Sequence, residues 1–152
     1  MKNAPPTRRA FVAGAAFVTL LPFGQARATS ADLEAAIKEV TRSAALRPGR
    51  IKLDIPPLIE NGNAVPMTVS VESPMTADDH VKTIHVFNEK NPQPHVLSAS
   101  LSPGNGKAVV GTRIKLADTQ KIVAVAETSK GEFLTASGDV IVTLAACIED
   151  II

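Results

Sequence analysis

In Val65-Pro66-Met67-Thr68-Val69-Ser70-Val71, an apolar residue that can face a core stands at every second position. Successive side chains of a β-strand point to opposite faces, so this alternation places the apolar side chains on one face and the others on the opposite face. A strand with one buried and one solvated face is typical of antiparallel sheets that cover a core from one side. The stretch therefore predicts an all-β protein.

Further strand patterns lie on both sides of this stretch, separated by turns rich in proline, glycine and asparagine. About seven short strands at this spacing predict an immunoglobulin-like antiparallel β-sandwich, with a small open barrel as the competing architecture. The chain has no Trp and a single Cys, so aliphatic side chains must fill the space between the sheets. Besides 65–71, we expect strands at 51–55, 81–87, 95–101, 108–116, 121–127 and 133–144, the last of them broken near Gly138.

A short N-terminal helix is expected before the strands. Apolar residues three and four positions apart predict an amphipathic helix over 31–43, with Ser30 as its N-cap and Asp32 at the positive end of its dipole. The triplet Arg47-Pro48-Gly49 is expected to end it. Because its apolar stripe is narrow and rich in alanine, we expect this helix to pack on a larger element rather than to stand alone.

Residues 1–28 have the organisation of an export signal. Arg8 and Arg9 precede an uncharged apolar run, 11–23, whose 13 residues are too few to cross a bilayer as a helix. Ala26-Arg27-Ala28 then supplies the small residues of a signal-peptidase site. The segment predicts twin-arginine export to the periplasm without stable membrane insertion after cleavage; a retained N-terminal anchor is the alternative.

The rest of the chain is expected to form one domain, 29–144, followed by a C-terminal arm, 145–152. Four of the 16 Lys and Arg residues lie in the signal and none of the 15 acids do, so 12 cations against 15 acids leave a net charge of −3. Only two aromatic rings, Phe87 and Phe133, remain after the signal. This composition argues against a nucleic-acid partner, which requires basic and often aromatic surfaces.

Cys147 is the only cysteine, and it lies between Ala145-Ala146 and Ile148 near the C-terminal end of the sequence. In an exported protein an unpaired thiol is either a small buried side chain, half of an inter-subunit disulfide, or a functional group. A thiolate forms sulfur–sulfur bonds, and two alanines keep the arm slim. The position therefore favours a covalent sulfur carrier, with a structural or assembly subunit as the alternative.

No catalytic motif accompanies the thiol. A cysteine nucleophile needs a base, usually histidine, but His80 and His85 face opposite ways if they share a strand, and His95 has no site-like context. We expect all three to be surface histidines, with no metal site and no cofactor. The protein is thus expected not to be an enzyme, and a thiol-dependent transferase is the weakest alternative.

These features together resemble a known family. The twin-arginine motif, Glu60-Asn61-Gly62, the stretch from Val65 to Met75 and the terminal cysteine are similar to the sulfur-carrier Y subunit of the periplasmic thiosulfate-oxidising (Sox) system. The resemblance covers nearly the whole chain. It implies an immunoglobulin-like sandwich in which Cys147 covalently holds thiosulfate-derived sulfur.

The resemblance also implies partners and one departure. The small Z subunit would form a heterodimer with the chain and be exported with it, while a c-type cytochrome, a manganese-dependent sulfate-releasing hydrolase and a sulfane dehydrogenase would bind transiently. The family's tail is Gly-Gly-Cys-Gly-Gly, whereas this chain has bulkier alanines before Cys147 and Ile148, Ile151 and Ile152 after it. These isoleucines have the apolar surface to fold back on the sandwich and shield the thiol.

Overall fold

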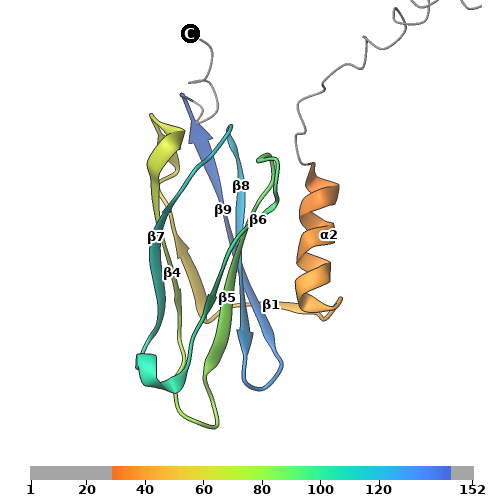
Figure 1. Cartoon of the computed structure of the whole chain (residues 1–152), viewed down its shortest axis with the longest axis vertical. Coiled ribbons are helices and arrows are strands. Elements are labelled where there is room, and N and C mark those ends of the chain that lie inside the picture. The colour runs from red at the N-terminus through yellow and green to blue at the C-terminus, as the bar shows by residue number, and fades with distance from the viewer. Residues whose placement is uncertain (1–28, 145–152) are drawn as a thin grey trace, which may run out of the picture.

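The computed structural model describes residues 29–144, which form one helix and nine strands (Figure 1). Two short 3-10 helices, η1 and η2, lie in the connections. The elements in chain order are α2 (Ser30–Thr41), β1 (Leu46–Pro48), β2 (Ile51–Asp54), β3 (Leu58–Ile59), η1 (Gly62–Ala64), β4 (Val65–Val71), β5 (Val81–Asn88), β6 (His95–Ser100), η2 (Pro103–Asn105), β7 (Ala108–Ile114), β8 (Gln120–Thr128) and β9 (Phe133–Val142).

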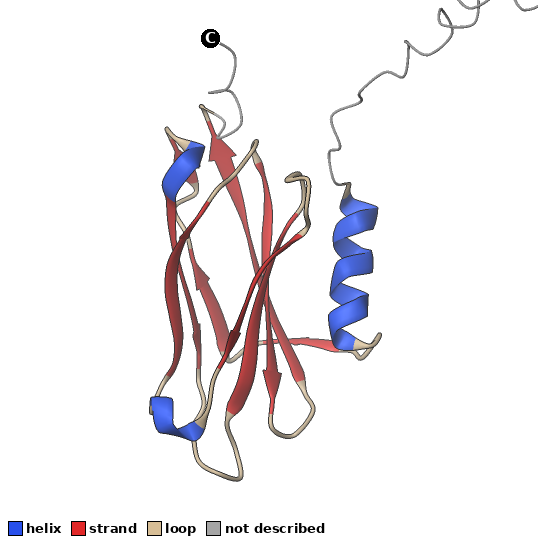
Figure 2. Ribbon diagram, in the orientation of Figure 1, coloured by secondary structure: helices blue, strands red, loops and turns tan. Residues whose placement is uncertain are grey.

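The strands form two sheets that enclose the core between them (Figure 2). The larger sheet has the order β1-β9-β8-β5-β6, with β3 also paired to β9, and the smaller sheet has the order β2-β4-β7. The predicted immunoglobulin-like sandwich is confirmed, and the competing barrel is wrong because the two sheets are separate. The defining stretch is β4, and its four alternating apolar residues are all buried.

The core between the sheets is almost entirely aliphatic, as the lack of Trp and of a disulfide required. Ile84 and Val86 of β5, Ile122 of β8 and Val140 of β9 are fully buried there, facing the buried side of β4. Both aromatic rings of the domain, Phe87 and Phe133, lie outside this core. They belong to a second cluster on the other face of the larger sheet.

Helix α2 covers that other face, which we call the outer face of the larger sheet (Figure 1). Its buried Leu33 packs with Phe87, Val125 and Phe133. The helix was predicted, but its cap lies one residue earlier than expected: the Thr29 hydroxyl, not Ser30, accepts from the backbone N–H of Asp32, while the Asp32 carboxylate accepts from the N–H of Thr29. This capping box satisfies two otherwise unpaired donors at the helix start.

Two strands were not predicted, and both pair with β9 in parallel. β1 lies beside Phe133–Thr135, and β3 lies beside Ile141 and Val142. Arg47 and Pro48, expected to end the helix, belong to β1; the helix ends earlier, where Arg42 takes a left-handed conformation with φ 52°. Segments this short carry no alternation, so only their long-range pairing makes them strands.

β9 is continuous from Phe133 to Val142, so the predicted break near Gly138 is wrong. Gly138 stays in register opposite Ile122 of β8, and the unbroken pairing carries the strand through this position. Within residues 29–144, no helix has the length and hydropathy needed to span a membrane.

Candidate functional site: the base of the cysteine arm

The predicted attachment residue Cys147 and its neighbours Ala145, Ala146 and Ile148 lie outside the described residues, as do Arg8 and Arg9 of the signal. The described chain extends to Leu144, three residues before the thiol. The candidate site can therefore be built from the residues that fix Leu144 and from the surface around it.

Backbone hydrogen bonds on the β3 side hold the end of β9. The N–H of Ile141 donates to the carbonyl of Pro57 over 2.9 Å, and that of Thr143 donates to the carbonyl of Ile59 over 3.0 Å. The N–H of Gly62 then donates to the carbonyl of Leu144 over 2.8 Å. The parallel pairing with β3 thus continues as a ladder to the last described residue.

Gly62 links this ladder to the smaller sheet as well. Its carbonyl accepts from the N–H of Leu116, just beyond β7, over 2.9 Å. The preceding Asn61 turns the chain, because its side-chain oxygen accepts from the N–H of Asn63 over 2.8 Å. The Glu60-Asn61-Gly62 motif, which sequence alone identified only as a tight turn, therefore supports the base of the arm.

Thr119 holds β9 from the opposite side. Its hydroxyl accepts from the N–H of Val142 over 3.0 Å and lies 3.4 Å from the carbonyl of the same residue. The Asp118 carboxylate accepts from the N–H of Thr119 over 2.7 Å and so orders the loop that carries this hydroxyl. Sequence reasoning placed Thr119 in a turn and missed this contact, because nothing local marks the distant strand as its partner.

Three exposed apolar residues belong to β3 and to the end of β9 with its extension. Leu58, Ile141 and Leu144 are 59%, 54% and 51% exposed, and they are three of the four exposed large hydrophobic residues in the described range. Leu58 and Ile141 are direct register partners across β3 and β9. We call these three residues the apolar rim. Adjacent exposed apolar residues such as Leu58 and Ile141 are typical of a surface that contacts another protein segment.

Two of the three histidines form a pair that sequence reasoning missed. His85 Nδ1 and His95 Nε2 lie 2.8 and 2.9 Å from the Ser98 hydroxyl oxygen, and the two rings are 5.6 Å apart. They meet because β5 and β6 are antiparallel neighbours. Burial, and secondarily the charge of His95, lowers the pKa of His85 below its ordinary value. His80 is separate, in the loop before β5, with its ring against the carbonyl of Thr76.

The histidine pair is far from Leu144, the last described residue. Across the sheet His85 is level with Val125 and Thr135, nine residues before Leu144 on β9. Nine strand residues span about 30 Å, whereas the three residues from Leu144 to Cys147 reach roughly 10 Å. The pair is therefore not placed to serve as a base for the thiol.

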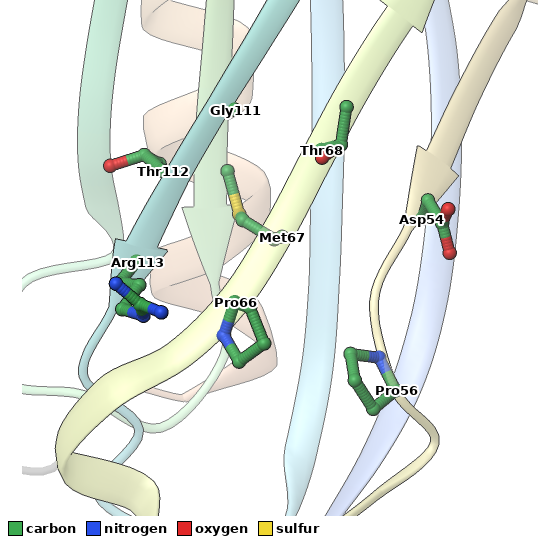
Figure 3. A pocket seen from close by; sticks show the side chains of 8 residues that line it. All are labelled: Asp54, Pro56, Pro66, Met67, Thr68, Gly111, Thr112 and Arg113. Atoms are coloured by element: carbon green, nitrogen blue, oxygen red, sulfur yellow. The ribbon is translucent and has the colours of Figure 1, made fainter.

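No three His, Cys, Asp or Glu side chains converge as a metal site would require, within the part of the chain that is described. A hollow lies on the smaller sheet (Figure 3). Asp54 of β2 and Arg113 of β7 carry its charges. Its lining residues are Asp54, Pro56, Pro66, Met67, Thr68, Gly111, Thr112 and Arg113.

The fold defines a small immunoglobulin-like β-sandwich, and its last strand, fixed on both sides, leads into the segment that carries the only thiol. The family model for "Sulfur oxidation protein SoxY" matches residues 37–147, so its last matched residue is Cys147. The chain belongs to this family, whose members are sulfur carriers.

Solved structures agree with this assignment. The sulfur carrier protein SoxY from Chlorobium limicola f thiosulfatophilum is similar with 28% identity and a TM-score of 0.64, over 76% of this chain and 100% of that one. A superoxide reductase (neelaredoxin) from Ignicoccus hospitalis shares the fold with 18% identity and a TM-score of 0.56, over 80% of this chain and 99% of that one. That second likeness concerns the fold alone. No curated protein gives a significant match.

Proposed function

We propose that this protein carries thiosulfate-derived sulfur covalently on Cys147 and presents it to oxidising and hydrolysing enzymes in the periplasm. The observation that carries the proposal is the Gly62–Leu144 hydrogen bond, which fixes the chain three residues before the only cysteine. A carrier needs a rigid body and a reactive group at a short, constant distance from it. Membership of a sulfur-carrier family supports the same role.

The chemistry of the arm is sulfur–sulfur bond formation. The Cys147 thiolate joins the outer sulfur of thiosulfate, and the step releases two electrons and the thiol proton. In this proposal the c-type cytochrome partner accepts the electrons. The manganese-dependent hydrolase then removes sulfate by hydrolysis, and the sulfane dehydrogenase oxidises the sulfur that remains. In this proposal the chain supplies the attachment site and its partners supply the catalysis, so the chain acts as a carrier.

The proposal includes the organisation of the whole chain. Residues 1–28, with Arg8 and Arg9, serve as the twin-arginine signal, 29–144 form the carrier body, and 145–152 form the arm. The small Z subunit is the expected heterodimer partner. Twin-arginine export moves folded cargo, which allows such a partner to be exported as part of the folded complex.

Replacing Cys147 by Ser tests this function in a host that oxidises thiosulfate. We expect Cys147→Ser to abolish thiosulfate-dependent oxygen uptake while the protein is exported, folds and copurifies with its partner. Ala145→Ser is the matched control, since it adds the same hydroxyl to the arm and keeps the thiol. The structural-subunit alternative would be favoured if Cys147→Ser left oxygen uptake undiminished. It would also be favoured if the substitution impaired only folding or assembly.

A further inference from the structure

A β-bulge places His95 and Ser98 of β6 next to each other. The two residues are three positions apart, so in a regular strand their side chains would point to opposite faces. The register with β5 shifts here, however, because the pairing passes from Leu97 directly to His95 and leaves Val96 as the extra residue. Bulges are common where a strand redirects a side chain toward a site.

Two imidazole nitrogens meet at one point beside this bulge. His85 Nδ1 and His95 Nε2 lie 2.8 and 2.9 Å from the hydroxyl oxygen of Ser98. A hydroxyl carries one hydrogen, so it donates to only one of the two rings, and the other ring donates its own N–H to the oxygen. A metal ion at the same point would instead accept a lone pair from both nitrogens.

The ring of Phe87 supports both imidazoles. Phe87 is fully buried, its ring stacks on that of His95 with the centroids 4.9 Å apart, and the His85 ring lies 6.3 Å from it. Rings that are already held by packing lose less freedom when they bind an ion. His95 and Ser98 are exposed and His85 is half-buried, so an ion reaches the point between them from solvent.

The charge state of the pair suits a cation. Burial, and secondarily the charge of His95, lowers the pKa of His85, so its imidazole is neutral at pH 7. Neutral imidazole is the form that binds metal ions. The carboxylate of Glu127 also acts on His85, and its negative charge favours a cation at this place.

We propose that His85 and His95 bind a divalent transition-metal ion, such as Zn²⁺ or Cu²⁺, between β5 and β6. Imidazole nitrogen suits these ions, whereas Mg²⁺ prefers oxygen ligands. A metal–imidazole bond is about 2.0–2.1 Å long, so each ring moves by roughly 0.8 Å toward the point that the Ser98 hydroxyl occupies. The exposed Ser98 side chain rotates aside to admit the ion.

The bound ion would fasten an edge strand. β6 is the last strand of the larger sheet, and the two ligands join it to β5. Within the described domain no third His, Cys, Asp or Glu side chain completes the ligand set, so water fills the other positions and the ion exchanges readily. The site does not involve the arm, and this inference is therefore independent of the proposed carrier function.

The test is titration of the untagged mature protein with Zn²⁺, after alkylation of Cys147 because a free thiol would itself bind the ion. Calorimetry gives the affinity, and NMR of ¹⁵N-labelled imidazoles shows which rings bind. We expect one ion per chain and shifts at His85 and His95. His85→Gln and His95→Gln should each weaken binding at least about tenfold. Added Zn²⁺ should raise the Tm of the wild type but not that of either variant.

His80→Gln is the matched control, because it removes an imidazole that lies apart from the pair, in the loop before β5. It should leave the affinity unchanged. Ser98→Ala, which removes the hydroxyl and keeps both rings, should also retain binding. His95 is exposed, so His95→Gln reports on the site even if the half-buried His85 proves necessary for folding.

Four results would each overturn the metal site. They are a wild-type chain that binds no Zn²⁺, binding that survives His95→Gln, binding lost in Ser98→Ala, and displacement of Zn²⁺ by an equal concentration of Mg²⁺. The last result would indicate that carboxylates, not imidazoles, hold the ion. None of these results affects the carrier role, which fails only if Cys147 holds no sulfur.

Discussion

The backbone N–H of Gly62 donates a 2.8 Å hydrogen bond to the carbonyl of Leu144, joining two parts of the chain that are 82 residues apart. Gly62 also accepts from Leu116, so a single buried glycine ties the start of the arm to the smaller sheet. The arm therefore leaves the body from a fixed point rather than from a frayed strand end. Cys147 follows Leu144 by three residues in the sequence.

Removing the side chain that shapes the Gly62 turn should loosen the base of the arm. Asn61→Ala leaves the N–H of Asn63 without its side-chain acceptor, and we expect a loss of about 0.5–1.5 kcal/mol of stability. Amide exchange at Gly62 should accelerate, as measured by NMR. Asn63→Ala is the matched control, because the contact involves only the backbone of Asn63. Equal exchange rates in the two variants would contradict this role of Asn61.

Thr119 should matter more than its place in a loop suggests. Thr119→Val keeps the side-chain shape but leaves the part-buried N–H of Val142 without an acceptor, and we expect about 1–3 kcal/mol of destabilisation in urea unfolding. Thr143→Val is the control, because the Thr143 hydroxyl is exposed. Water can replace it as the donor to the carbonyls of Ile59 and Glu60. A cost no larger than that of Thr143→Val would show that Thr119 does not hold β9.

The histidine pair predicts a pH dependence of stability. Because burial lowers the pKa of His85 in the folded state, the unfolded chain binds more protons once the pH falls toward the ordinary value of 6.5. The stability that depends on a neutral His85 is fully present above pH 6.5. It is lost as the pH falls through the pKa that His85 has in the folded state. The free energy of unfolding should therefore decrease between pH 7 and about pH 5, and His85→Gln should flatten that slope. An unchanged slope in the variant would contradict the assignment.

The contact between helix α2 and the sheet should be a large single contribution to stability. Leu33 is buried against Phe87 and Phe133, so Leu33→Ala should cost about 2–5 kcal/mol in urea unfolding. Ala35→Gly on the exposed side of the same helix separates loss of packing from loss of helix propensity, and should cost about 1 kcal/mol. Equal costs for the two variants would mean that the helix does not depend on the sheet.

Sequence reasoning succeeded where the signal was local. Alternation located β4 and the other long strands because each carries its own inside–outside pattern, and three- and four-residue spacing located α2. β1 and β3 escaped because two or three residues have no period, and the parallel partner that makes them strands lies more than 80 residues away. The cap was placed one residue late because neighbouring Thr29 and Ser30 both have a suitable hydroxyl.

In the candidate site too, only the features with a local sequence signal could be predicted. Cys147 could be chosen from sequence because it is the only thiol, and Asn61-Gly62 could be recognised as a turn. The contacts of Gly62 with Leu144 and of Thr119 with Val142 could not be predicted from sequence. Each joins residues that only the sheet topology brings together. The His85–Ser98–His95 cluster was missed for the same reason: it depends on the register of β5 against β6.

The intact mass of the mature protein shows whether Cys147 carries sulfur. The protein is purified from the periplasm of thiosulfate-exposed cells and measured before and after mild reduction, with Cys147→Ser as the reference. If Cys147 is the carrier thiol, we expect thiosulfonate or sulfane adducts that map to Cys147, disappear with reductant and are absent from the variant. An unmodified wild-type chain under these conditions, or adducts that persist in Cys147→Ser, would contradict it.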